Sequence, residues 1–125
     1  MLYSYINGDP IVAVDVKSKD GSWYVVPAYL DSGAGYSVFT KDYAFAFGLN
    51  LKAGRKINLT VGNGEKIDAY VHKLSVKFAS KEFIAEISFS PNLGVGTNIL
   101  GMKSFFDNFH ICFNNKKSQV EINSF

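Results

Sequence analysis

Apolar and polar residues alternate with a period of two along most of this chain, and that period is typical of β-strands. The alternation predicts strands over residues 11–16, 23–30, 36–39, 57–61, 67–78, 83–89, 98–100, 109–113 and 119–122. Asp20-Gly21 and Asn63-Gly64 are dipeptides that favour tight hairpin turns. Many short strands joined by regular turns predict an all-β fold, with a closed or nearly closed β-barrel.

Two strands carry irregularities. Pro27 interrupts residues 23–30, and because proline cannot donate to a strand ladder we expect it at a sheet edge or a bulge. The apolar positions of residues 67–78 change parity part of the way along, which predicts a bulge or sharp bend near His72-Lys73. The hairpin around Asn63-Gly64 is then long, and its tip leaves the body of the protein.

Short helices interrupt the strand pattern. Thr40 is a favourable N-cap and Asp42 suits a first turn, so we expect a helix over residues 41–47, ended by Gly48. A second short helix is expected over residues 102–107. Residues 91–96 are expected to form a loop.

Composition limits the classes of function. The chain has 125 residues, enough for one domain spanning residues 1–125. Charged residues make up only 19%, which suggests that a partner subunit covers part of the surface. A net charge of +2 without a basic cluster argues against binding to nucleic acid.

Cysteine content and hydropathy bear on location. Cys112 is the only cysteine, so the chain can form no internal disulfide, which fits a reducing compartment. We find no signal peptide at the N-terminus and no stretch near the ~20 apolar residues of a membrane helix. The expectation is a soluble cytoplasmic protein that does not associate with membranes.

The leading candidate for chemistry is Asp31, in Asp31-Ser32-Gly33-Ala34, which follows an apolar strand. The small residues after it allow close approach of the backbone. Taken alone, Asp-Ser-Gly is ordinary turn chemistry. Other segments, in their order along the chain, favour a catalytic role.

Three segments together resemble the retropepsins, the single-domain aspartic peptidases. Asp31-Ser32-Gly33-Ala34 is similar to their Asp-Thr/Ser-Gly-Ala signature, and Asn98-Ile99-Leu100-Gly101 is similar to their second signature. Between the two lies a glycine-tipped hairpin, about residues 56–72, where that family places its flap. The resemblance covers nearly the whole chain and implies a retropepsin-type barrel.

The resemblance implies an aspartic endopeptidase that acts as a homodimer. Its chemistry needs two carboxylates that share one proton, because like charges so close cannot both ionise. This chain has one such motif, so the second Asp31 would come from a second copy across a twofold axis. The implied substrate is an extended peptide or protein, and no metal or other cofactor is needed.

The resemblance also implies roles for the neighbouring residues. Ser32 would hold the partner's loop across the dimer, and Gly33 would present its carbonyl to substrate. Ala34, in place of a hydroxyl residue, implies activity at mildly acidic pH. Ile99, Leu100 and Gly101 would be structural residues beneath the site. The flap that closes over the substrate would be formed by Val61, Gly62, Asn63, Gly64 and Glu65.

Two alternatives remain open, and a third, a metal site, is weaker. The chain could have the same fold without activity and serve as a peptide-binding or dimerisation module. It could also be a structural barrel in which Asp31 only forms a turn. His110 and Cys112 share a strand face, but with His72 they are too few for a closed zinc site.

Overall fold

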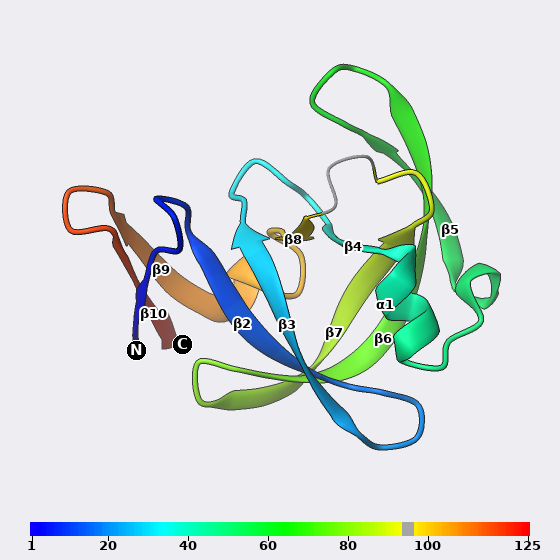
Figure 1. The fold of residues 1–125 in the computed structure, drawn as a ribbon, viewed down its shortest axis with the longest axis horizontal. Coiled ribbons are helices and arrows are strands. Elements are labelled where there is room, and N and C mark those ends of the chain that lie inside the picture. Colours follow the sequence, from blue (N-terminus) through cyan, green and yellow to red (C-terminus); the bar gives the residue numbers. More distant parts are fainter. Residues whose placement is uncertain (94–96) are drawn as a thin grey trace.

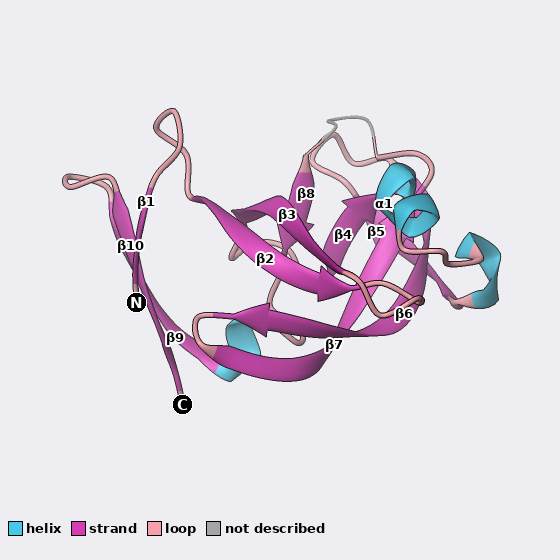
Figure 2. Cartoon of the chain, turned by 60° about the horizontal axis from the view of Figure 1, so that its bottom comes forward, coloured by secondary structure: helices cyan, strands magenta, loops and turns pink. Residues whose placement is uncertain are grey.

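The structure is a computed structural model that describes residues 1–93 and 97–125. The part of the predicted loop at residues 94–96 lies outside the described residues. Figures 1 and 2 show a mostly β protein with a few short helical turns. The strands are β1 (Leu2–Ser4), β2 (Ile11–Lys17), β3 (Trp23–Leu30), β4 (Ser37–Thr40), β5 (Arg55–Thr60), β6 (Lys66–Phe78), β7 (Lys81–Ser90), β8 (Asn98–Leu100), β9 (Phe109–Asn114) and β10 (Gln119–Ser124). The helical elements are α1 (Lys41–Ala46) and the 3-10 turns η1 (Leu51–Ala53) and η2 (Phe106–Asn108).

The larger sheet closes into a barrel. Its strand order is β2-β3-β8-β4-β7-β6-β5, and β2 also pairs with β6 through Val16 and Val76. This extra pairing closes six strands on themselves and leaves β5 outside the ring as the free arm of the β5–β6 hairpin. The predicted closed β-barrel is therefore confirmed.

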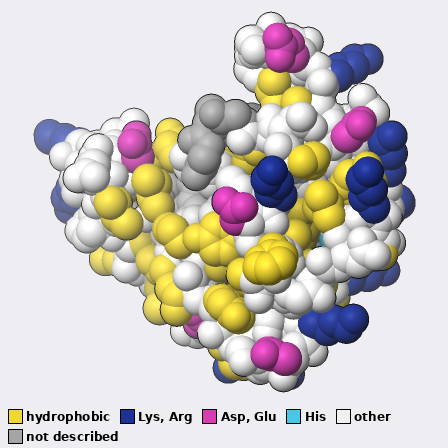
Figure 3. All heavy atoms as spheres, turned by 45° about the vertical axis from the view of Figure 1, so that its right-hand side comes forward, with side chains coloured by type: hydrophobic (Ala, Val, Ile, Leu, Met, Phe, Trp, Pro, Cys, Tyr) yellow, Lys and Arg dark blue, Asp and Glu magenta, His cyan; other side chains and the backbone are white. Residues whose placement is uncertain are grey.

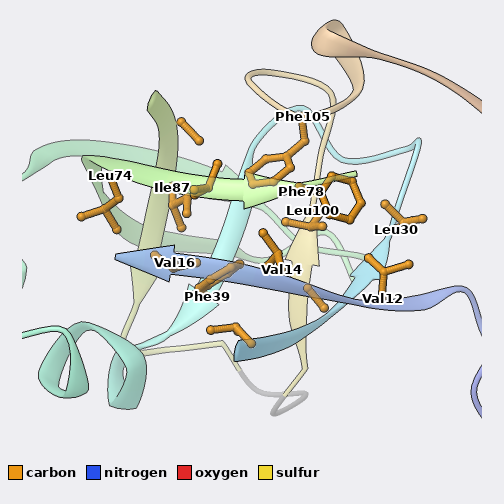
Figure 4. Packing of buried hydrophobic residues seen from close by; sticks show 14 of the residues in the cluster. Val12, Val14, Val16, Leu30, Phe39, Leu74, Phe78, Ile87, Leu100 and Phe105 are labelled. Carbon is orange, nitrogen blue, oxygen red and sulfur yellow. The ribbon is translucent and has the colours of Figure 1, made fainter. Parts of the chain in front are cut away.

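Alternating side chains of the barrel strands form the core. In β2, the buried positions are Val12, Val14 and Val16, while the residues between them are exposed or half-buried. Phe39, Ile87, Leu100 and Phe105 are fully buried and meet β2 inside the barrel (Figure 4). Burying one such side chain contributes about 1.5–3 kcal/mol, so this face of each strand is what fixes the register.

Strand β6 differs from its predicted form. Its pairing with β7 runs without a break from Tyr70–Phe89 to Phe78–Lys81, so the predicted bulge at His72-Lys73 is wrong. The buried side chains do change parity, from Ala69 and Val71 to residues 74, 76 and 78. The parity changes because the neighbouring strand changes. The first half of β6 pairs with β5, whereas its second half pairs with β2.

The predicted helix over residues 102–107 is also wrong. The segment forms turns, followed by the short 3-10 turn η2. Ser104 has φ +70°, a left-handed conformation that an α-helix does not accommodate. The side-chain amide of Asn108 donates to the Ser104 carbonyl, and the Phe105 side chain is fully buried. Tertiary packing of Phe105 thus overrides the helical preference.

Two other local predictions are refined. The β2–β3 register continues past Pro27 without a bulge, and β8 pairs with β3 only from Ala28 onward, so Pro27 lies just before that ladder. Thr40 occupies the N-cap of α1 in an extended conformation, but no side-chain cap bond forms. Gly48 follows the helix with φ +74°, as expected for a residue that ends it.

The chain ends form a separate sheet within one subunit. Its order is β1-β10-β9, with Tyr3 opposite Val120 and Val120 opposite Phe113. The N-terminal ammonium donates to the Ile122 carbonyl at 2.8 Å. Both termini therefore lie together at one side of the barrel (Figure 1). None of the helices in the described part of the chain has the length and apolar character that crossing a membrane requires.

Candidate active site

Asp31 lies where β3 leaves the barrel, immediately after the buried Leu30. Its backbone N–H donates to the Leu100 carbonyl at 3.0 Å, so the turn begins in a fixed position. The Gly33 N–H donates to Asp31 Oδ1 at 2.9 Å, and the Ala34 N–H donates to the Asp31 carbonyl at 3.1 Å. Asp31 is half-buried, and a backbone donor holds its carboxylate in place.

The loop after Asp31 is fastened to the segment after β8. Met102 N–H donates to the Ala34 carbonyl at 2.8 Å, and Lys103 N–H donates to the Gly35 carbonyl at 3.0 Å. Two backbone bonds over two successive residues act as a short ladder. They keep the loop on the barrel although its own residues are small.

Gly101 is the point of closest approach between the two segments. A Cβ atom at this position would lie 2.5 Å from the Tyr36 carbonyl oxygen and 2.7 Å from that of Ala34. Both neighbours are backbone atoms, so neither can swing away. Only glycine fits here, so Gly101 allows the segment after β8 to pack directly against the loop that follows Asp31.

Ile99 and Leu100 lie on opposite faces of β8. Leu100 is fully buried in the core and pairs with Leu30, directly below Asp31. Ile99 is half-exposed and lies between Tyr29 of β3 and Val38 of β4. Of the two, Leu100 is therefore the residue beneath the loop, while Ile99 faces away from the core.

Two buried polar residues support the site: Ser37, which no sequence motif contains, and Asn98, which begins the Asn98-Ile99-Leu100-Gly101 segment but has no predicted role of its own. Ser37 Oγ accepts the Gly101 N–H at 3.0 Å. Asn98 joins two strands, because its Oδ1 accepts the Thr40 N–H and its Nδ2 donates to the Pro27 carbonyl, both at 3.1 Å. Each contact spans a large separation in sequence, so no local pattern reveals it.

The predicted flap turn is a tight, internally bonded loop. Val61 N–H donates to the Glu65 carbonyl, Gly64 N–H donates to the Val61 carbonyl, and Glu65 N–H donates to Asn63 Oδ1, each at 2.9 Å. Gly64 has φ +85°, while residues 62–65 are exposed. Figures 1 and 3 show the hairpin tip standing out from the barrel, at the end that also carries the 31–36 loop.

The histidines and the cysteine lie elsewhere. His72 Nε2 lies 3.0 Å from the Leu51 carbonyl, and its ring packs edge-on against Phe89. Cys112 Sγ and His110 Nε2 are 3.8 Å apart on β9, in the terminal sheet. Among residues 1–93 and 97–125, no three His, Cys, Asp or Glu side chains are grouped so that they could hold a metal ion.

The fold is similar to that of solved aspartic proteases. A crystal structure of a retropepsin-like aspartic protease from Rickettsia conorii aligns with a TM-score of 0.72, at 19% identity over 98% of this chain and 97% of that one. EIAV protease, complexed with the inhibitor HBY-793, aligns with a TM-score of 0.55, at 20% identity over 77% of this chain and 84% of that one. The chain thus has a retropepsin-like fold. No sequence model of a known family matches it, and no curated protein matches it.

Proposed function

We propose that this protein is an aspartic endopeptidase whose active site is shared by two copies of the chain. One observation carries the proposal. The half-buried Asp31 carboxylate ends a barrel strand, accepts the Gly33 N–H, and rests on a loop fastened to Gly101. A carboxylate held in this way at the open end of a retropepsin-like barrel is placed to act on a bound water.

The reaction needs a base and an acid at the same place. One ionised carboxylate takes a proton from water, whose oxygen attacks the carbonyl carbon of the peptide. The other, protonated, carboxyl donates to the carbonyl oxygen. The tetrahedral intermediate then collapses: the carboxyl that took the water proton gives it to the amide nitrogen, the C–N bond breaks, and a hydroxyl of the intermediate returns its proton to the other carboxylate as the C=O bond re-forms, so the pair again shares one proton.

Because the reaction needs two carboxylates, the proposal requires a dimer. Asp31-Ser32-Gly33 occurs once in the chain, so one copy supplies half of the pair. A twofold axis beside Asp31 would bring two identical carboxyl groups together, as a symmetric interface permits. Ser32 is exposed next to Asp31, which supports its proposed role in contacting the partner's loop.

The proposed substrate is an extended peptide held between the Asp31 loops and the flap. The turn at residues 61–65 belongs to the β5–β6 hairpin, whose strand β5 pairs with β6 on one side. Peptides in extended form bind well beside such strands through backbone hydrogen bonds.

Cys112 is a free cysteine, and we include a reducing compartment such as the cytoplasm in the proposal.

Cleavage of a peptide library tests the proposal. We expect the purified protein to cut peptides at mildly acidic pH, a statine-type inhibitor to block cutting, and Asp31→Asn to abolish it. Asp42→Asn is the matched control, because Asp42 is an exposed aspartate on α1, and it should retain activity. Binding of peptides without any cleavage by the wild-type protein would identify the silent peptide-binding module instead.

A further inference from the structure

A second concave region lies away from the Asp31 loop. It is a hollow of about 440 Å³, bounded by the end of β2, the segment after α1, and the middle of β6. The β2–β3 turn beside it lies at the opposite end of the barrel from the 31–36 loop (Figure 1). A hollow of this size is within the range of small-molecule sites.

The charge of this hollow is of one sign. Lys17, Lys19 and Lys73 line it together with the polar side chains of Ser18, Asn50 and Ser75, and no acidic residue belongs to its lining. Cations that share a concave surface repel one another and attract anions, and the surrounding protein strengthens that attraction.

The acidic groups nearby are already engaged. Glu86 lies opposite Lys73 in the β6–β7 ladder, but its carboxylate pairs with Arg55 at 3.7 Å. Asp20 borders the adjoining smaller hollow, where its carboxylate accepts the Ser18 hydroxyl and the Ser22 N–H. Within the described residues, the ion pairs involve none of the three lysines, although Lys17 Nζ lies 5.9 Å from the centre of the Trp23 ring, a contact that leaves its charge unneutralised.

The hollow also has a rigid frame. The Lys19 N–H donates to the Phe47 carbonyl at 2.8 Å, which ties the β2–β3 turn to the end of α1. His72 Nε2 lies 3.0 Å from the Leu51 carbonyl and so links β6 to η1. The three segments that carry the lysines and the polar groups are thereby held in place before any ligand arrives, which lowers the entropic cost of binding.

The geometry points to a binding site for a small polyanion with two or more phosphate groups, held by Lys17, Lys19 and Lys73. Phosphate oxygens would accept from the three ammonium groups and from the Asn50 amide. Three cations around one hollow favour a ligand with more than one phosphate group over a single phosphate, because the attraction grows with the negative charge of the ligand. The site does not depend on the proposed peptidase activity, because its ligand is recognised by charge at another surface.

Titration with pyrophosphate at constant ionic strength tests the site. We expect saturable binding of one ligand per chain by calorimetry, with NMR amide shifts centred on Ser18, Asn50 and Ser75. Inorganic phosphate should bind about tenfold more weakly. The double variant Lys17→Gln/Lys73→Gln should weaken pyrophosphate binding about tenfold or more, which corresponds to about 1.4 kcal/mol.

The control is a double variant with the same loss of charge elsewhere. Lys116→Gln/Lys117→Gln removes two exposed lysines from the β9–β10 turn and should change the affinity less than about twofold. Both double variants should keep the wild-type melting temperature, since all four side chains are exposed. Equal weakening by the two variants, equal affinity for phosphate and pyrophosphate, or the absence of saturable binding would each overturn the proposal.

Discussion

The backbone N–H of Asp31 donates to the carbonyl of Leu100 at 3.0 Å, which joins the proposed catalytic turn to a strand from the far end of the sequence. The bond continues the parallel pairing of Leu30 with Leu100 by one step beyond β3. The position of Asp31 is therefore fixed by the barrel and not by the loop alone.

Gly101→Ala should destabilise the protein by about 1–3 kcal/mol, because its Cβ would collide with backbone oxygens of Ala34 and Tyr36. Denaturant unfolding measures the change. Gly35→Ala is the matched control in the same loop, since a Cβ there meets nothing within 4 Å. Equal stability of the two variants would show that the close approach at Gly101 does not constrain the loop.

Ser37→Ala should cost about 1–3 kcal/mol, because it leaves the buried Gly101 N–H without its acceptor. Peptidase activity should fall as well, since the segment beneath the Asp31 loop loses its anchor. Unfolding and cleavage assays measure the two effects. Ser4→Ala, at an exposed position in β1, should leave both unchanged. A Ser37 variant as stable as the Ser4 variant contradicts the prediction.

Gly64→Ala should disturb the flap turn, because Gly64 has φ +85° and a left-handed alanine costs about 1–2 kcal/mol. We expect a lower kcat/KM and faster amide exchange around residues 61–65, with little change in the unfolding of the barrel. Gly62→Ala is the control on the same turn, where a Cβ meets nothing within 4 Å. If Gly62→Ala reduces kcat/KM as much as Gly64→Ala, strain in the turn is not the cause.

Ala34→Ser should move the acidic limb of the pH–rate profile to lower pH. In the retropepsins that the sequence resembles, a hydroxyl residue at this position donates to the catalytic aspartate, and such a bond favours the ionised form of a carboxyl group. The wild-type profile should peak at mildly acidic pH, and the shift is measured as kcat/KM against pH for both proteins. A wild-type optimum at strongly acidic pH would contradict the prediction that Ala34 gives activity at mildly acidic pH.

The sequence predicted the features that depend on local chemistry. Alternation identified the barrel strands, and Asn63-Gly64 identified a turn in which Gly64 has a positive φ. The errors occurred where distant contacts decide the structure. The parity change in β6 comes from a change of neighbouring strands without a bulge, and buried Phe105 with left-handed Ser104 prevents the expected helix.

The same distinction holds for the candidate site. Asp31 and Gly101 are recognisable as parts of short motifs in the sequence. Ser37 belongs to no such motif, and the motif that contains Asn98 does not reveal its contacts, because the partners of both residues are remote in sequence. The proposed polyanion site could not be predicted from the sequence for a similar reason, since its three lysines come from separate segments of the chain.

The shared active site is the central claim, and subunit mixing tests it most directly. Wild-type protein is allowed to exchange subunits with an equal amount of Asp31→Asn protein, and cleavage is compared with that of the same amount of wild-type protein incubated alone. If two Asp31 carboxylates form one site, mixed dimers are inactive and activity falls to about half of that of the wild-type protein alone. Activity that stays equal to that of the wild-type protein alone, under conditions where exchange is shown to occur, would contradict the account.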